Sequence, residues 1–269
     1  MRSMIAYSRR AVLLVGGLTM LAGGLAMLAA KPVLAQGSDT LAKIRAKGTI
    51  VIGNGGAFPP FEFMENSQLT GFDRDLGEEI AKRLGVRAEW IVSDFAGLIP
   101  GLTSGRTDVI ISALTRTPER EQRIAFSRAY YQTGIAAAYR ADVTVANPDD
   151  LTGKIVGLQT GTAGEKFTRD SYADKVKELK TYPEFPLALR DLEIGRVQVV
   201  VNTMPVLRYN LARSNRAGLK LSNVWDARDI GINTRPADTN LMAEINKLLS
   251  DMSSDGFLKS LESKWFGTN

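Results

Sequence analysis

The chain has 269 residues and a net charge of +5, but its first 35 residues carry four of the 34 basic side chains and none of the 29 acidic ones. The remaining residues have 30 basic against 29 acidic side chains and no basic tract with clustered aromatics, which excludes a nucleic-acid-binding protein. The absence of cysteine excludes disulfides and lipid attachment through an amino-terminal Cys, and with no histidine either we expect no metal and no cofactor.

The first 35 residues have the pattern of a secretory signal peptide. Arg2, Arg9 and Arg10 precede an apolar run over residues 11–30, and cleavage is expected near Ala35. The run is long enough to span a bilayer, so an uncleaved anchor is the alternative, although the glycines within the run favour cleavage. The two adjacent arginines also loosely resemble a twin-arginine export signal. We therefore expect a soluble protein of the periplasm.

In the remaining 234 or so residues, short apolar runs alternate with segments of helical periodicity, which is typical of a mostly parallel sheet flanked by helices. We predict strands at 50–53, 88–92, 109–112, 155–158 and 197–202. A helix is predicted over 73–84, because Leu76, Ile80 and Leu84 form an apolar stripe and Gly85 suits the residue after the last turn. A second helix is predicted over 255–266.

The segment from Ser112 to Arg120 places hydroxyls and a guanidinium at the carboxyl end of the predicted strand 109–112. Ligands of open α/β sheets bind at that end, and an Arg offers a fixed fork of donors that matches a carboxylate. The segment thus indicates a clamp for a small anion. The alternative is a surface Arg120 that pairs with Glu119 or Glu121.

A second loop that suits an anion follows the predicted strand 155–158, beyond an expected domain boundary at 147–153. Its Gly and Thr residues, 160–164, lead into a predicted helix and would aim backbone N–H groups at an anion. The glycine spacing fits no nucleotide-phosphate motif, and a tight turn without function is the alternative.

Nine sequence blocks carry a resemblance to a known family. They are AFPPFEF at 57–63, GFDRDL at 71–76, IAKRLG at 80–85, FAGLIPGL at 95–102, TPER at 117–120, FS at 126–127, YY at 130–131, GT at 161–162 and KWFG at 264–267. With these blocks in this order, the chain resembles the extracellular solute-binding proteins of family 3, which bind polar amino acids for ABC transporters. The resemblance extends over essentially the whole chain after the leader.

This resemblance implies a type II periplasmic-binding-protein-like fold of two α/β lobes joined by two crossing segments. Lobe 1 would comprise 37–130 plus 232–269 and lobe 2 would comprise 135–227, with crossings near 130–134 and 227–231. Arg120 would clamp the ligand carboxylate between the lobes, and Phe58 and Phe95 would wall the pocket. The ligand-binding set that the resemblance implies is Phe58, Phe95, Ala113, Thr115, Arg120, Thr160, Thr162, Asn202 and Thr203.

The chain departs from the family at the other end of the ligand. Thr203 stands where the family usually has an Asp that meets the ligand ammonium, and residues 54–56 supply no charge. Three alternatives stay open. Another acid, such as Asp94 or Asp229, meets the ammonium; carbonyls and hydroxyls alone hold it; or the ligand has no α-ammonium and is a small organic acid or related metabolite.

We expect a monomeric binding protein that delivers a small carboxylate to an ABC transporter permease, or alternatively one that feeds a membrane sensor. Cyclohexadienyl and arogenate-type dehydratases resemble the same fold, and Glu62 and Glu165 are the nearest carboxylates for such chemistry. Without His or Cys, a binding protein is favoured over an enzyme.

Overall fold

The computed structural model describes residues 39–213 and 218–267, which fall in one compact unit spanning Gly37–Asn269. The signal peptide expected over residues 1–35 lies outside the described residues. Within the described ranges, no helix is both long enough and apolar enough to cross a membrane.

A nine-stranded sheet runs through the described residues in the order β5-β1-β6-β12-β7-β10-β8-β9, and β11 pairs with β7. Its strands are β1 (Thr49–Asn54), β5 (Arg87–Val92), β6 (Val109–Ile110), β7 (Ala125–Arg140), β8 (Ile155–Gln159), β9 (Glu178–Tyr182), β10 (Val199–Thr203), β11 (Leu219–Leu221) and β12 (Asp226–Thr234). A small sheet of β2 (Ala57–Phe58), β3 (Glu62–Glu65) and β4 (Gln68–Thr70) lies beside it.

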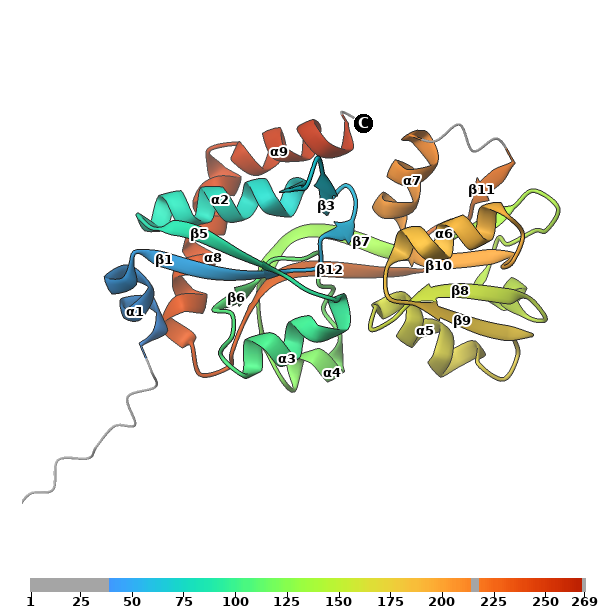
Figure 1. Ribbon diagram of the computed structural model, residues 1–269, viewed down its shortest axis with the longest axis horizontal. Helices are drawn as coiled ribbons and strands as arrows, with labels where there is room; N and C mark the ends of the chain where they lie inside the picture. The colour runs from blue at the N-terminus through green and yellow to red at the C-terminus, as the bar shows by residue number, and fades with distance from the viewer. Residues whose placement is uncertain (1–38, 214–217, 268–269) are drawn as a thin grey trace, which may run out of the picture. The chain divides into compact units, whose positions relative to one another are not determined.

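Strands β7 and β12 form the middle of the large sheet and link its two halves (Figure 1). They pair antiparallel from Asp226 opposite Ile135 to Thr234 opposite Ala125. Outside this ribbon, β1 pairs parallel with β5 and β6 in one half, and β8 pairs parallel with β9 and β10 in the other. The sheet is thus parallel at both ends and antiparallel in its centre, and the crossings predicted at 130–134 and 227–231 fall within β7 and β12.

The helices cover the two halves separately (Figure 1). They are α1 (Thr40–Lys47), α2 (Phe72–Leu84), α3 (Leu98–Thr103), α4 (Pro118–Glu121), α5 (Ala163–Tyr172), α6 (Phe185–Glu193), α7 (Met204–Arg213), α8 (Thr239–Ser254) and α9 (Phe257–Phe266), with 3-10 turns η1 (Phe95–Gly97) and η2 (Pro148–Leu151). Helices α1, α2, α8 and α9 pack together, and α1 and α2 contact β1. On the other half, α5 and α6 contact β8 and β10, and α7 contacts β7, β10 and β11.

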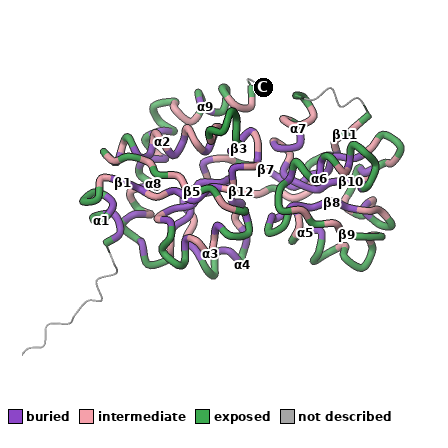
Figure 2. Tube along the Cα trace, viewed as in Figure 1, coloured by how far each residue is buried: buried purple, intermediate pink, exposed green. Residues whose placement is uncertain are grey.

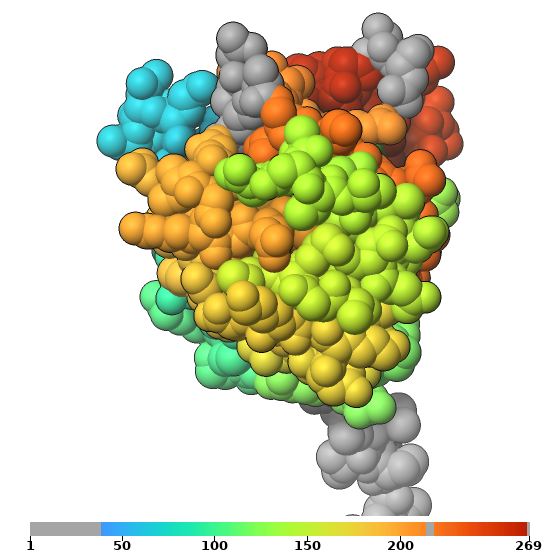
Figure 3. Space-filling model, turned by 90° about the vertical axis from the view of Figure 1, so that its right-hand side faces the viewer, coloured from blue at the N-terminus to red at the C-terminus, as the bar shows by residue number. Residues whose placement is uncertain are grey.

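Burial follows the same division, with the strands and the inner faces of the helices buried and the outer turns exposed (Figure 2). Figure 3 looks onto the end of the molecule that carries β8, β9 and α5, and its surface comes mainly from the middle of the chain. Each half therefore has strands and helices of its own, and β7 and β12 are shared.

Three predicted elements are shorter in the structure than in the sequence analysis. The strand predicted at 197–202 begins at Val199, because the N–H of Val197 donates to the carbonyl of Asp191. The other two are the strand predicted at 109–112 and the helix predicted at 255–266. The strand predicted at 109–112 ends at Ile110, because Ala113 adopts a positive φ of 43° and its N–H turns away to the carboxylate of Asp73. The helix predicted from residue 255 begins at Phe257, because Gly256 has a φ of 82°. In these last two cases a left-handed residue ends or delays the regular element.

Gly77 in helix α2 packs closely against the ring of Trp90, and a substitution at Gly77 can test this packing. A Cβ on Gly77 would lie 2.5 Å from Cη2 of Trp90, whereas a Cβ on Gly101 in α3 would meet nothing within 4 Å. Replacing a helical Gly by Ala ordinarily stabilises by up to about 1 kcal/mol, but overpacking costs about 1–3 kcal/mol. Thermal unfolding should therefore show Gly77→Ala destabilised and Gly101→Ala unchanged or stabilised. A gain in both variants would contradict this packing.

Candidate functional site

Arg120 is buried, with 9% of its surface exposed, and its guanidinium holds two segments of the chain. Nη1 donates to the carbonyl oxygen of Thr115 at 2.6 Å and to its Oγ1 at 2.9 Å, and Nη2 donates to the carbonyl oxygen of Gly161 at 2.9 Å. Burial, helped by the positive charge of Arg228, lowers the pKa of Arg120 to about 10. The guanidinium therefore stays charged at neutral pH while surrounded by neutral acceptors.

The acidic neighbours of Arg120 in the sequence pair elsewhere. Glu121 forms an ion pair with Arg116 at 2.6 Å, and Glu119 forms one with Lys166 at 3.2 Å. Among the described residues, no carboxylate lies within 4.0 Å of the Arg120 side chain in an ion pair. The alternative of a surface pair with Glu119 or Glu121 therefore does not describe Arg120 in this structure.

The short helix α4 explains why Arg120 turns inward. Thr117 caps α4, since its side chain accepts from the N–H of Arg120, and Pro118 occupies the first turn. The cap fixes where α4 begins, and Arg120 follows on the side that faces Thr115. The start of α4 at Thr117 thus positions the guanidinium of Arg120 at the strand end.

Two aromatic rings lie next to this guanidinium. The rings of Phe58 and Phe95 are stacked with centroids 6.5 Å apart, and the guanidinium of Arg120 lies 5.7 Å from the centroid of Phe95. Both rings are buried. The structure therefore brings together Phe58, Phe95, Thr115 and Arg120, as the sequence analysis expected of a carboxylate site with apolar walls.

The loop before α5 reaches the same guanidinium through a carbonyl group. Gly161 has a φ of 80°, and a Cβ there would lie 3.2 Å from Cα of Ala96, so only a glycine allows this close approach. Its N–H donates to Oε2 of Glu165 at 2.6 Å. Thr162, which caps α5, is buried, and Thr160 is exposed.

The backbone N–H groups of this loop have partners of their own. The N–H of Thr160 donates to the carbonyl of Tyr182, and that of Thr162 donates to the carbonyl of Gln159 at 3.4 Å. It is thus the carbonyl of Gly161, and not an N–H group of the loop, that meets Arg120 here. The role of the 160–162 N–H groups as carboxylate donors stays a prediction.

A pair of fully buried carboxyl groups, Glu62 and Asp73, lies behind the strand end. Ser112 donates to Oε1 of Glu62 at 2.6 Å, while Asp73 accepts from the N–H of Ala113 at 2.6 Å and from the hydroxyl of Tyr130 at 2.8 Å. Burial and the nearby charge of Asp73 raise the pKa of Glu62 well above its ordinary range, and burial raises the pKa of Asp73 to about 6. Burial therefore makes both carboxyl groups harder to ionise than exposed ones.

Sequence reasoning missed this pair. Asp73 falls three residues before Leu76 and seven before Ile80, on the face of α2 that the periodicity predicts to be buried. An acidic residue on a buried helix face was the available signal, because such a group requires donors around it. Its partners come from β3, from the loop after β6 and from β7, and only the fold brings them to it.

Asn202 and Thr203 lie at the end of β10 and are both buried. Oδ1 of Asn202 accepts from the N–H of Thr203 at 2.7 Å, but Nδ2 of Asn202 and Oγ1 of Thr203 have no hydrogen-bond partner among the described residues. Of the two acids proposed to replace the missing Asp, Asp94 is exposed and Asp229 accepts from Gln132 at 3.3 Å.

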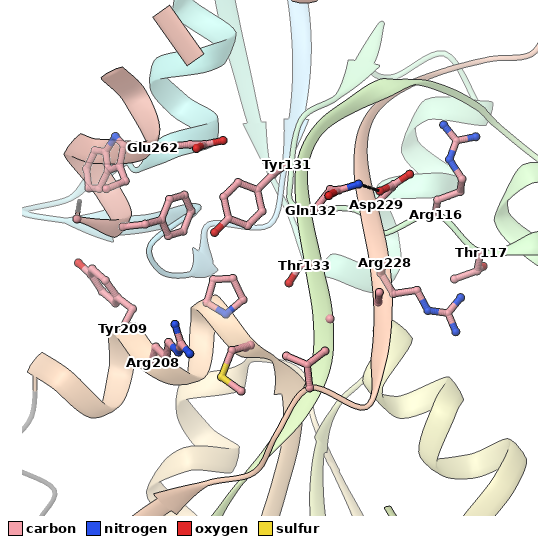
Figure 4. Close-up of a pocket in the computed structure, with 18 of the residues that line it drawn as sticks. Arg116, Thr117, Tyr131, Gln132, Thr133, Arg208, Tyr209, Arg228, Asp229 and Glu262 are labelled. Atoms are coloured by element: carbon pink, nitrogen blue, oxygen red, sulfur yellow. Dashed lines mark hydrogen bonds between the residues drawn. The ribbon is translucent and has the colours of Figure 1, made fainter. Parts of the chain in front are cut away.

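A cavity of about 920 Å³ lies along β7 and β12 and extends to α7 and α9 (Figure 4). Tyr131, Thr133, Arg208 and Glu262 line it, whereas none of the nine predicted ligand-binding residues does. Arg228 also lines it and extends from β12 toward the side on which Thr117 lies (Figure 4). The cavity is therefore distinct from the Arg120 cluster. Across residues 39–213 and 218–267, no group of three or more acidic side chains could hold a metal ion.

The sequence profile of the bacterial extracellular solute-binding proteins, family 3, matches residues 50–268. The chain belongs to this family. The L-cystine-binding protein TcyJ of Escherichia coli K12 is 30% identical over 232 residues, which cover 85% of this chain and 86% of that protein. Other relatives in the family include proteins named as arginine-binding and as lysine/arginine/ornithine-binding periplasmic proteins.

Solved structures show the fold of the family. A P235GK mutant of the arginine-binding protein ArgBP from T. maritima superposes with a TM-score of 0.80 at 35% identity, covering 85% of this chain and 99% of that one. An ancestral amino acid-binding protein, described as a precursor of cyclohexadienyl dehydratase, has a TM-score of 0.79 at 30% identity and covers 84% and 99%. The predicted type II fold of two α/β lobes joined by two crossing segments is confirmed.

Proposed function

We propose that this protein captures an amino acid or a related small carboxylate between its two lobes and delivers it to an ABC transporter permease. The observation that carries the proposal is the buried guanidinium of Arg120, whose hydrogen-bond partners in the described chain are neutral oxygens of Thr115 and Gly161. A buried cation is costly without an anionic partner. A ligand carboxylate would supply that partner.

The bond from Nη2 of Arg120 to Gly161 suggests how binding and lobe closure are coupled. Arg120 and Thr115 belong to predicted lobe 1, and Gly161 belongs to predicted lobe 2. A carboxylate held by Arg120 would displace or share this bond and bring donors of both lobes onto one ligand. Closure is favoured to the extent that the ligand binds the closed state better than the open state.

The relatives and the predicted signal peptide both support a periplasmic location for the proposed function. Relatives of the family are periplasmic binding proteins, and the predicted signal peptide over 1–35 would export this chain to the periplasm. We propose a monomer that presents its closed surface to a membrane permease. A receptor that senses the closed form is the alternative partner, and it would use the same ligand site.

Dehydratase chemistry has weaker support than binding. The carboxyl group of Glu62 is tied to Ser112 and lies in a buried pair, and Glu165 binds the N–H of Gly161 and the side chain of Arg169. Both acids that the sequence offered for catalysis thus have structural partners. Incubation of the protein with prephenate or arogenate is expected to show no turnover above background, and measurable turnover would contradict the proposal.

A thermal-shift screen tests ligand capture directly. A ligand that binds only the folded protein stabilises it by about 2.7 kcal/mol at a hundred times Kd. For a chain of this size such a gain raises the melting temperature by roughly 5–10 °C. We expect at least one small carboxylate, from a panel of amino acids and their deaminated counterparts, to produce this shift. If the uncharged amides of those acids stabilised the protein equally, the carboxylate clamp would be wrong.

A further inference from the structure

We infer that the ion pair between Glu119 and Lys166 stabilises the closed arrangement of the two lobes and so tightens ligand binding without touching the ligand. This inference rests on the proposed function, because it assumes that a ligand is captured by closure of the lobes. It gives a role to two charged side chains outside the predicted ligand-binding set. We call Glu119 and Lys166 the interlobe pair.

The interlobe pair joins helices that belong to different halves of the molecule. Glu119 lies in α4, which follows β6 in predicted lobe 1, and Lys166 lies in α5, which follows β8 in predicted lobe 2. Figure 1 shows α4 among the elements of one half and α5 among those of the other. Oε1 of Glu119 and Nζ of Lys166 are 3.2 Å apart. The contact therefore exists only while the two lobes are close together.

Other contacts between the predicted lobes lie beside this pair. Glu119 directly precedes Arg120, whose Nη2 donates to the carbonyl oxygen of Gly161 at 2.9 Å. Gly161 directly precedes the cap of α5, and a Cβ on Gly161 would lie 3.2 Å from Cα of Ala96 in η1. The side chains of Lys166 and Glu119 are 43% and 54% exposed. The interlobe pair is thus the solvent-exposed part of the surface along which α4 and α5 meet.

Lys166 has a second acidic partner within its own lobe. Nζ of Lys166 lies 2.6 Å from Oδ2 of Asp170, one turn further along α5. Asp170 stays beside Lys166 when the lobes separate, because both residues belong to the same helix, whereas Glu119 moves away with α4. Lys166 therefore has one acidic partner when the lobes are apart and two when they are together.

This arrangement fixes the direction of each charge's effect on affinity. A contact that is made only in the closed state contributes to Kd, because the ligand binds that state better. An exposed ion pair changes an equilibrium constant by up to about fivefold, so we expect about threefold from Glu119. Asp170 acts in the opposite direction, since it supplies Lys166 with a partner in the open state and repels Glu119 in the closed state.

The first test compares two neutral variants that each remove one negative charge from this surface. The probe is the compound that raises the melting temperature most in a panel of the common amino acids, L-cystine and their 2-oxo counterparts. By isothermal titration calorimetry, Glu119→Gln should weaken binding of that compound about threefold, and Asp170→Asn should tighten it by up to about twofold. A change in net surface charge alone would move both variants in the same direction.

A double-mutant cycle separates the interlobe pair from any direct effect of Glu119 on its neighbour Arg120. In the Lys166→Gln background, Glu119→Gln should no longer weaken binding, because the partner in the other lobe is absent. Glu121→Gln is the matched control in the same helix. Glu121 pairs with Arg116 inside predicted lobe 1 at 2.6 Å, so its removal should leave Kd unchanged.

Stopped-flow measurement of the same compound identifies the state on which the pair acts. A contact present only in the closed state slows reopening, so Glu119→Gln should raise the dissociation rate about threefold and leave the association rate unchanged. The melting temperature without added compound reports whether each variant folds. A Glu119→Gln variant that binds like wild type, or that weakens binding equally in both backgrounds, would overturn the inference and leave the proposed function intact. If no compound in the panel binds the wild-type protein, the proposed function fails and the inference fails with it.

Discussion

Arg120→Ala is expected to weaken binding of the cognate carboxylate at least a hundredfold. The wild-type guanidinium is buried and already oriented by Thr115, so it needs little ordering when a carboxylate arrives. Removing one partner of a buried, hydrogen-bonded charge pair costs about 2–5 kcal/mol, and a hundredfold in Kd corresponds to about 2.7 kcal/mol. Titration calorimetry with the ligand found in the screen measures the loss.

Arg123→Ala is the matched control for this prediction. Arg123 lies three residues further along the chain, its side chain is exposed, and its removal should leave Kd unchanged. Arg120→Lys keeps the charge but loses the fork, so it should bind more weakly than wild type and more tightly than Arg120→Ala. An Arg120→Ala variant that stays folded and binds within threefold of wild type, a difference of less than about 1 kcal/mol, would show that Arg120 is not the clamp.

Glu62→Gln is expected to stabilise the protein at pH 8 by about 1–3 kcal/mol. The wild-type carboxyl is fully buried with a raised pKa, so the folded protein binds a proton that the unfolded chain releases as the pH rises above about 4. Gln keeps an oxygen for Ser112 and supplies a permanent N–H donor toward Asp73. The variant therefore removes the need to hold a proton or bury a charge.

The pH dependence gives the sign of this effect. For an acid with a raised pKa, the stabilising contribution is complete below the unfolded pKa and is lost as pH rises through the folded pKa. For Asp73 this loss falls between about pH 4 and about pH 6, and for Glu62 it extends to higher pH. Urea unfolding of wild type at several pH values should show this decline, and Glu62→Gln should flatten it.

Glu65→Gln serves as the control for Glu62→Gln, because Glu65 lies in the same strand β3 with an exposed side chain. Its effect on unfolding should stay within about 0.5 kcal/mol at all pH values. At pH 4, where Glu62 is protonated in both the folded and the unfolded states, Glu62→Gln should bring little gain. A Glu62→Gln variant that is less stable than wild type at pH 8 would mean that the carboxylate itself is needed.

Most strands and helices could be predicted from the sequence, because the hydrophobic patterns that indicate them are local. The stripe of Leu76 and Ile80 predicts α2, and the apolar run after Asp108 predicts the strand that precedes Ser112. The sequence also places Arg120 within ten residues of the end of that strand, and the resemblance to the family adds the role of a carboxylate clamp. These features need no knowledge of how distant segments meet.

The remaining features depend on distant contacts and could not be predicted in this way. The antiparallel bridge between Thr115 and Ile230 joins the site segment to β12, and these residues are far apart in the chain. Likewise the Glu62 and Asp73 pair needs the turn at Ala113, whose positive φ no local pattern indicated. Sequence periodicity reports which face is buried but not which groups meet there.

The central ribbon of β7 and β12 has a consequence for how the protein would signal that it is loaded. The two crossing segments are hydrogen-bonded to each other along their length, with register shifts on either side of Gly231. Two separate flexible linkers would let the lobes tumble through many orientations, whereas one twisted ribbon restricts them to bending about a common axis. Under the proposed function, a closing motion confined in this way would end in a single arrangement of the outer surfaces, so a membrane partner could distinguish full from empty by shape alone, whatever the chemistry of the cargo inside.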